Sequence, residues 1–308
     1  MPELPEVETT KTSLTPLLGN TVTGIHVHCK KLRWAVANDL DSLIGYHLKK
    51  VERRAKYLIL TFIKEPSCSI DTQATNNAKT SPLTVNEKKL IIHLGMSGSL
   101  QQYTWQSKKR KHDHVIIEFS NSQNQPIQLH YHDPRRFGAI VWYEDYADKL
   151  LSHLGVEPLT DGFNAEYLYH NIHPNPPKKR AVIRPIKAVI MDQKYVVGVG
   201  NIYATESLFL SHIHPLTPAN QLTKIQLKLL IEHIKNVLNT SIQQGGSSLK
   251  DFSVANGQTG YFQQTLHVYG KYNQPCPICG ETIEKVNITG RSSTFCPNCQ
   301  PYDKKAKQ

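Results

Sequence analysis

The chain has 308 residues, of which 39% are hydrophobic, so it is long enough for about two domains and a small appendage. Its formal net charge of +11 favours a polyanionic partner, with nucleic acid as the first candidate. The sequence contains neither an apolar run of about 18 residues nor a basic-then-apolar leader, which excludes a typical membrane protein and predicts a soluble, intracellular one.

The first half is predicted to be rich in β-structure. Residues 3–18 show helical spacing with acidic residues at the start, and Gly19-Asn20 should end this helix. Short β-branched or alternating runs then predict a sandwich or barrel; they are residues 21–27, 57–63, 89–94, 114–119, 127–131 and 139–143. Residues 64–87 are polar and aperiodic, and we interpret them as a loop insertion.

The second half changes to helical periodicity after a Pro- and Gly-containing stretch. The helices are expected at residues 164–172, 178–192, 201–210 and 223–244. These patterns predict a β-rich N-terminal domain at 1–150, a linker at 151–162, a helical domain at 163–265 and a finger at 266–300.

Four cysteines near the C-terminus form two C-x-x-C pairs, Cys276/Cys279 and Cys296/Cys299. This spacing lets two tight turns present four thiolates to one tetrahedral Zn²⁺, which has no open position and is therefore structural. Iron, two disulfides or idle thiols are the alternatives.

Basic residues cluster in both halves of the chain and on the finger, where Arg291 lies between the two cysteine pairs. The other clusters are residues 49–56, 108–111, 135–136 and 178–184. Each cluster alone is typical of a solvated face, but together they favour a track that neutralises several phosphates.

The N-terminus begins Met1-Pro2-Glu3. Removal of Met1 would leave a secondary amine on Pro2, and α-amines have pKa values near 8, so a fraction is nucleophilic at neutral pH. Glu3 could supply the proton that such chemistry requires. The residues alone also allow a simpler interpretation, in which Pro2 only begins a helix.

Taken together, the motifs resemble those of the bacterial formamidopyrimidine-DNA glycosylases, also called 8-oxoguanine DNA glycosylases. The resemblance covers nearly the whole chain. It rests on Pro2-Glu-Leu-Pro-Glu-Val-Glu-Thr9, Arg53-Arg-Ala-Lys56-Tyr-Leu, His93-Leu-Gly-Met96-Ser-Gly, Lys111-His112-Asp-His, Asp133-Pro-Arg-Arg-Phe137-Gly, Met191-Asp-Gln, Gly198-Val-Gly-Asn201-Ile-Tyr-Ala, Gly260-Tyr-Phe and the four-cysteine finger.

The resemblance implies an α+β multidomain fold with an N-terminal β-sandwich flanked by helices, a helix-two-turns-helix domain and a zinc finger on a β-hairpin. It also implies a bifunctional glycosylase and AP lyase of base excision repair, which excises oxidised purines from duplex DNA and cuts the strand by β,δ-elimination. A monomer in the bacterial cytosol, with one structural Zn²⁺, would fit this family.

The matching positions imply specific roles. Pro2 would be the nucleophile that forms a Schiff base, Glu3 the proton donor to the sugar, Lys56 the proton donor in β-elimination and Arg291 the donor in δ-elimination. Because guanidinium is a weak acid, phosphate binding suits Arg291 better than proton donation.

A base inside a duplex must be flipped out before it is cut, and the vacancy must be filled. Met96, Arg135 and Phe137 match the void-filling residues of the family, although core packing would also suit Met96 and Phe137. The remaining implied DNA contacts are His93, His112, Arg184, Lys187 and Asn201, with Arg184 chosen among several basic residues. The loop at 253–262 matches the lesion-capping loop.

Two rival functions remain at this point. An endonuclease VIII-like enzyme would share the Pro2-Glu3 chemistry but prefer oxidised pyrimidines, and Leu4 with the void-filling set favours the purine enzyme. A non-catalytic zinc-ribbon DNA-binding protein would not need an N-terminal amine.

Overall fold

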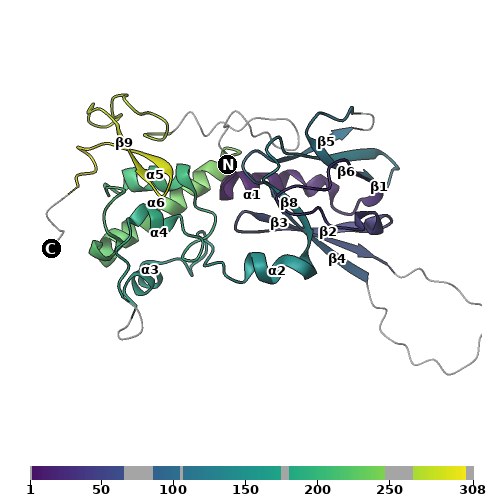
Figure 1. Ribbon diagram of the computed structural model, residues 1–308, viewed down its shortest axis with the longest axis horizontal. Helices are drawn as coiled ribbons and strands as arrows, with labels where there is room; N and C mark the ends of the chain where they lie inside the picture. The colour runs from purple at the N-terminus through teal and green to yellow at the C-terminus, as the bar shows by residue number, and fades with distance from the viewer. Residues whose placement is uncertain (1, 66–85, 105–106, 175–179, 247–265, 303–308) are drawn as a thin grey trace, which may run out of the picture.

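The computed structural model describes residues 2–65, 86–104, 107–174, 180–246 and 266–302, and three parts can be distinguished in it (Figure 1). The N-terminal part contains two helices and eight strands. They are α1 (Leu4–Ser13), β1 (Thr21–Val27), β2 (His47–Arg54), β3 (Tyr57–Lys64), β4 (Asn86–His93), β5 (Ser99–Thr104), β6 (Asp113–Ser120), β7 (Pro126–His132), β8 (Ala139–Trp142) and α2 (Tyr143–Leu151), with short 3₁₀ turns at Thr15–Leu17 and Leu40–Leu43.

The eight strands are hydrogen-bonded in the order β5-β7-β6-β1-β2-β3-β4-β8, and the pairs are antiparallel. Strands β1 and β2 share only one register pair, Thr21 with His47, so the sheet consists of two four-stranded halves joined at this point. Apolar residues of both halves, such as Phe119 and Phe62, belong to one buried core. This arrangement confirms the predicted sandwich.

Helix α1 is shorter than the sequence predicts, because it ends at Ser13 rather than Leu18. A proline at position 16 has no amide hydrogen to continue an α-helix, and Thr15–Leu17 forms a 3₁₀ turn instead. The start of α1 has a capping box, in which Glu3 and Glu6 exchange side-chain and backbone hydrogen bonds.

The second part contains the helices α3 (Ala165–Ile172), α4 (Ile186–Ile190), α5 (Asn201–Leu210) and α6 (Lys224–Gln243), with a 3₁₀ turn at Ala219–Gln221. Helices α3, α5 and α6 agree with the predicted ranges. The predicted helix at 178–192 is wrong in its first half: the described residues before Ile186 are not helical, since Pro185 is the N-cap of α4. Two turns connect α5 to α6.

The third part is the finger, whose hairpin pairs β9 (Glu284–Ile288) with β10 (Arg291–Phe295). Thr289 and Gly290 form its turn, and both have positive φ angles of 47° and 75°. Two consecutive left-handed residues match the twist of an antiparallel hairpin.

Three further elements escaped sequence analysis: β2, β5 and α2. Strand β2 is rich in charged residues and β5 contains two glutamines, so neither shows an apolar alternation. The predicted strand at 139–143 is one residue too long, because Tyr143 begins α2. Strands β3 and β4 also extend into the predicted insertion, of which residues 66–85 lie outside the described residues. The loop at 253–262 lies outside them as well.

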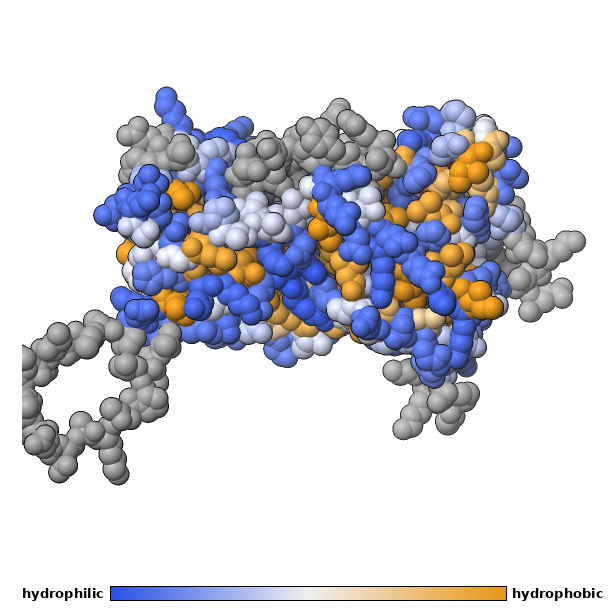
Figure 2. Space-filling model, turned by 180° about the vertical axis from the view of Figure 1, so that it is seen from behind, coloured by the Kyte–Doolittle hydropathy of each residue, from blue (hydrophilic) through white to orange (hydrophobic). Residues whose placement is uncertain are grey.

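The surface mixes residue types. On the face opposite to that of Figure 1, hydrophobic residues occur as separate spots among hydrophilic ones (Figure 2), which is ordinary for a globular protein. None of the described helices combines the length and the apolar character that a membrane crossing requires.

Candidate active site

The start of α1 meets the start of α5, and Glu3 lies between them. Its carboxylate accepts hydrogen bonds from the backbone amides of Ile202, at 3.1 Å, and Tyr203, at 3.5 Å. A Cβ on Gly200, the N-cap of α5, would overlap this carboxylate, so only glycine allows the approach. Figure 1 shows the N-terminal end of the chain at this meeting of the two halves.

Burial governs the chemistry of Glu3, which is only 2% exposed. Burial raises the pKa of its carboxyl, and the nearby Glu6 adds to this, while Lys56 and the amide of Ile202 act in the opposite direction. A carboxyl with a raised pKa keeps its proton closer to neutral pH and can act as an acid. Pro2 is buried beside it.

Lys56 lies in the turn between β2 and β3, next to Ala55, which has a positive φ of 54°. Glu157 holds this turn: it accepts from the Ala55 amide at 2.7 Å, from Arg53 at 2.8 Å and from Arg54 at 3.0 Å. The two arginines therefore link the halves of the molecule through Glu157. The basic track expected at this cluster stays a prediction.

Lys56 itself is 4% exposed. Burial lowers its pKa, the charge of Arg291 lowers it further, and the charge of Glu3 opposes both. Lys56 is thus close to both the carboxylate of α1 and the guanidinium of the finger. A lysine with a lowered pKa gives up its proton more readily than an exposed one.

Lys187 connects three elements at the same place. Its ammonium donates to Asn201 Oδ1 at 2.8 Å, to Thr205 Oγ1 at 2.7 Å and to Ser293 Oγ at 2.6 Å. Asn201 in turn donates from Nδ2 to the backbone oxygen of Ser292 at 3.0 Å. The finger hairpin is therefore fastened to the first turn of α5. Burial lowers the pKa of Lys187 to about 7.

We call Pro2, Glu3, Lys56, Lys187 and Asn201 the junction. Beside it is a cleft with a volume of about 280 Å³, lined in part by Lys56, Arg184 and Arg291. Arg184 donates to Asp192 Oδ2 at 2.9 Å and is partly exposed. Three cations around one cleft suit phosphate groups.

A second group of predicted residues lies at the edge of the β-sandwich. Met96 and Phe137 are 37% and 44% exposed, so the core-packing alternative is wrong for both. The guanidinium of Arg135 lies over the Phe137 ring, 5.0 Å from its centroid. The turn of Met96 lies against this loop, because a Cβ on Gly95 would come within 2.5 Å of the Phe137 carbonyl carbon. We call Met96, Arg135 and Phe137 the wedge.

The two predicted histidines flank the wedge. His93 precedes the Met96 turn, packs against Tyr57 with ring centroids 4.9 Å apart, and accepts from the Gly95 amide at Nδ1. Burial, with the charges of Lys56 and Arg33, lowers its pKa to about 4, so it is neutral near pH 7. His112 is half-buried, and its ring lies 5.8 Å from that of His132.

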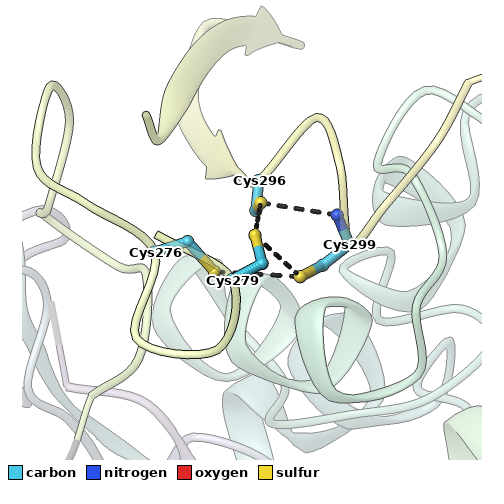
Figure 3. Close-up of side chains that lie close together, drawn as sticks. All are labelled: Cys276, Cys279, Cys296 and Cys299. Atoms are coloured by element: carbon cyan, nitrogen blue, oxygen red, sulfur yellow. Dashed lines mark hydrogen bonds between the residues drawn. The ribbon is translucent and has the colours of Figure 1, made fainter. Parts of the chain in front are cut away.

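The four cysteines of the finger point toward one another (Figure 3). The Sγ–Sγ distances include 3.5 Å for Cys279–Cys296 and Cys279–Cys299, and 3.8 Å for Cys276–Cys299. Four sulfurs at about 2.3 Å from a tetrahedral zinc would be about 3.8 Å apart. The donor set therefore fits zinc, and among the described residues it is the one group that could hold a metal.

Four residues near the junction were not assigned a role from the sequence. Glu6 accepts from Tyr203, whose hydroxyl also meets Ser241 at 2.7 Å, and the capping-box spacing could have identified it. Tyr269 is hydrogen-bonded to Asn201, but a single tyrosine among 14 carries no sequence signal. Such residues are brought together only by the tertiary fold.

Three family models match the chain. The formamidopyrimidine-DNA glycosylase N-terminal domain matches residues 1–140, the formamidopyrimidine-DNA glycosylase H2TH domain matches residues 154–253, and the zinc finger found in FPG and IleRS matches residues 273–301. The last match agrees with the four-sulfur geometry, and the cysteines form a structural zinc site.

Similar whole proteins were also found. The chain is 54% identical to a formamidopyrimidine-DNA glycosylase of Psychrobacter arcticus, over 98% of this chain and 99% of that protein. It is 44% identical to the one of Acinetobacter baylyi, over 99% and 100%. A Lactococcus lactis FPG variant in complex with Fapy-dG-containing DNA is 30% identical, with a TM-score of 0.79, and covers 98% of this chain and 100% of its own.

A second solved structure has DNA of another kind. The complex between the Lactococcus lactis Fpg and abasic-site DNA has a TM-score of 0.78 and 30% identity, with 97% of this chain and 100% of the other covered.

Proposed function

The chain belongs to the formamidopyrimidine-DNA glycosylase family, and from this premise we propose that it excises oxidised purines through the amine of Pro2 and then cuts the strand. DNA glycosylase activity in base excision repair, DNA binding and a structural zinc follow from the family match. The lesion, the nucleophile and the roles of single residues are the proposal.

In the first proposed step, the lone pair of the Pro2 nitrogen forms a bond to C1′ of the damaged nucleotide. The bond between C1′ and the base breaks, and the base leaves with the electron pair. The Pro2 nitrogen loses its proton, and the departing base takes up one proton in exchange. This requires prior removal of Met1, because an acylated proline nitrogen is an amide whose lone pair is delocalised. An amine with pKa near 8 is partly unprotonated at neutral pH.

Glu3 is the proposed proton donor to the sugar. As the ring opens, its oxygen takes the proton of Glu3, and the C1′–nitrogen bond becomes an iminium. The burial of Glu3 and the raised pKa of its carboxyl support this role. After Glu3 has given up its proton, two backbone amides at the start of α5 stabilise its carboxylate.

Lys56 and Arg291 are proposed to act in strand cleavage. Loss of a proton from C2′ expels the 3′ phosphate, and a second elimination expels the 5′ phosphate. Lys56 supplies a proton in the first elimination, and Arg291 binds the departing phosphate in the second. Both residues line the cleft beside Glu3, which supports these roles.

The wedge and the other predicted DNA contacts are proposed to hold the opened duplex. Met96 and Phe137 would replace the flipped nucleotide in the stack, and Arg135 would hydrogen-bond to the orphaned base. His93, His112, Arg184, Lys187 and Asn201 are the proposed contacts to the DNA backbone. Exposed apolar side chains beside an arginine support this assignment.

The main support for the proposal is that Glu3 is buried against the start of α5, beside Pro2 and Lys56. An excision assay with purified protein tests it: duplexes with 8-oxoguanine or an oxidised pyrimidine opposite a natural partner are compared at equal enzyme. Preferred release of 8-oxoguanine is expected. Preference for the pyrimidine favours the endonuclease VIII-like alternative, and tight binding without release favours a non-catalytic DNA-binding protein.

We further propose that the protein acts as a monomer in the bacterial cytosol. The relatives found are bacterial, and the substrate is chromosomal DNA. Light scattering of the protein, free and bound to one duplex, should give one chain per particle.

A further inference from the structure

Asp133 is a fully buried carboxylate with no role in the reaction proposed above. Its Oδ1 accepts from the hydroxyl of Ser97 at 3.1 Å and from the backbone amide of Arg135 at 3.3 Å. Its Oδ2 accepts from the amide of Gly138 at 2.8 Å and from the hydroxyl of Tyr131 at 3.4 Å. The carboxylate thus accepts from the Met96 turn through Ser97, from strand β7 through Tyr131, and from two amides of the loop that Asp133 itself begins.

The backbone of Asp133 makes a third connection. Its amide donates to the backbone oxygen of His112 at 3.0 Å, and its own carbonyl oxygen lies 2.8 Å from Nε2 of His114. The segment that carries His112 is therefore joined to the same residue as the two loops.

Each of the three segments carries proposed DNA contacts. Ser97 follows Met96 directly, Asp133 and Gly138 enclose the loop of Arg135 and Phe137, and the third segment contains His112. The hydroxyl of Tyr131 adds a further contact, because it also lies 3.1 Å from the backbone oxygen of His93, just before the Met96 turn.

We propose that Asp133 is a positioning residue for base flipping: its carboxylate holds the Met96 turn and the Arg135–Phe137 loop in one arrangement, so that the wedge enters the DNA stack as a unit. The inference rests on the function proposed above, because it assigns the wedge a role in opening the duplex.

The backbone supports the need for such a residue. Arg136 has a φ of 55° and Gly95 a φ of 66°, so both loops contain a left-handed residue, which is costly for Arg136 because it has a side chain. The wedge is also exposed, so little apolar packing holds it in place. Burial and the neighbouring carboxylate of Asp133 raise the pKa of Tyr131 well above its ordinary value, which keeps its hydroxyl a donor.

The test uses Asp133→Asn, which preserves the shape but replaces one acceptor oxygen by an NH₂ group that faces another donor. Losing buried hydrogen bonds of this kind should slow excision of 8-oxoguanine from duplex DNA by about 10- to 100-fold. Cleavage of a duplex with a preformed abasic site does not require a base to be flipped, and it should change by less than about threefold.

A direct readout of flipping accompanies the rates. With 2-aminopurine next to the lesion, the wild type should give a rapid fluorescence rise as the stack opens, and Asp133→Asn should reduce its rate or amplitude. Loss of stability alone would lower excision and abasic-site cleavage together and would leave the flipping step of the folded fraction unchanged.

Asp113→Asn is the matched control. Asp113 is also a buried aspartate of the same sandwich, but its carboxylate accepts from Arg110, His130 and His132 rather than from the wedge loops. This variant should lower the melting temperature without changing the ratio of excision to abasic-site cleavage.

If Asp133→Asn does not fold, two other variants weaken the same connection. Ser97→Ala removes the hydrogen bond to Asp133 Oδ1, and Tyr131→Phe removes a hydroxyl that contacts both Asp133 Oδ2 and the backbone oxygen of His93. Each should shift that ratio by a few-fold. The inference is overturned if folded Asp133→Asn keeps the wild-type ratio of excision to abasic-site cleavage and the wild-type flipping signal. It is also overturned if Ser97→Ala and Tyr131→Phe both keep them. Failure of the proposed function looks different: the wild type itself then cleaves abasic DNA but leaves 8-oxoguanine in place, which also removes the premise of the inference.

Discussion

The junction and the wedge both contain residues of the N-terminal half, but water reaches them to very different degrees. Glu3, Lys56 and Lys187 are almost fully buried, whereas Met96 and Phe137 are more than one-third exposed. In the junction, burial changes the pKa of each charged group, which suits proton transfer. In the wedge, apolar side chains stay exposed, which suits insertion between bases.

The comparison shows that the two regions depend on different supports. The junction is held by helix termini and by the finger, through Lys187 with Ser293 and Asn201 with Ser292. The wedge is held by a buried carboxylate within the sandwich. Damage to one support should therefore leave the other region intact.

Of all the changes, zinc removal should have the largest effect, because it damages the support of the junction and leaves that of the wedge intact. A structural zinc contributes about 10 kcal/mol or more to folding of its module, so Cys296→Ser or chelation should unfold the finger and release Ser292 and Ser293 from the junction. Excision and abasic-site cleavage should both fall by more than about 100-fold. Activity assays with metal analysis check this.

Cys29→Ser is the matched control, because Cys29 lies outside the cluster. It should retain activity and zinc. Full activity of a zinc-free Cys296→Ser protein would show that the junction does not need the finger.

Glu3→Gln should slow base excision by about 10²- to 10⁴-fold, the range for loss of a general acid. Removal of a buried charge should offset the loss of the 3.5 Å hydrogen bond from the Tyr203 amide, so the melting temperature should change little. Single-turnover excision rates and thermal melts check both points. The exposed Glu144 on α2 is the control, and Glu144→Gln should behave as wild type; equal losses in the two variants would contradict the role of Glu3.

Met96→Ala and Phe137→Ala should each slow excision by about tenfold, because unstacking a base costs a few kcal/mol and each side chain recovers only part of it. Abasic-site cleavage and stability should change little, since exposed side chains contribute little to folding. Ile225→Ala, on the exposed side of α6, is the control. If Met96→Ala or Phe137→Ala lowered the rates on lesion and abasic duplexes equally, the wedge would not have a role separate from that of the junction.

Lys187 should affect how the stability of the protein depends on pH. Its folded pKa is about 7, below the value of about 10.4 for an unfolded lysine. Between these two values the unfolded chain binds a proton that the folded chain lacks, so stability rises with pH there, by up to about 1.4 kcal/mol per pH unit. Lys187→Met should reduce this slope in denaturant titrations at pH 7 to 10; an unchanged slope would show that Lys187 is charged when folded.

The fold could be predicted where the period of apolar residues is clear. Helix α6 agrees with its predicted position because it buries one regular face, and strands β1, β3 and β6 agree because they contain runs of apolar and β-branched residues. Strand β2 escaped prediction since its charged residues pair with partners distant in sequence, such as Arg53 with Glu8 and Glu157. The domain boundaries at 150, 162 and 265 stay predictions.

The site could be predicted only as far as motifs identify it. The cysteine spacing alone predicted the zinc site, whereas Pro2, Met96 and Phe137 needed the family resemblance, because the residue pattern favoured simpler roles. Asp133 lies inside the motif Asp133-Pro-Arg-Arg-Phe137-Gly, yet its connection to Ser97, 36 residues earlier, exists only in three dimensions.

Covalent trapping tests the central claim most directly. Protein freed of Met1 is mixed with a duplex that carries 8-oxoguanine opposite cytosine, borohydride is added to reduce an iminium, and the adduct is mapped by peptide mass spectrometry. The account predicts an adduct on Pro2, and none when an N-terminal extension acylates that nitrogen. An adduct on a lysine, or equal trapping of the extended protein, would contradict it.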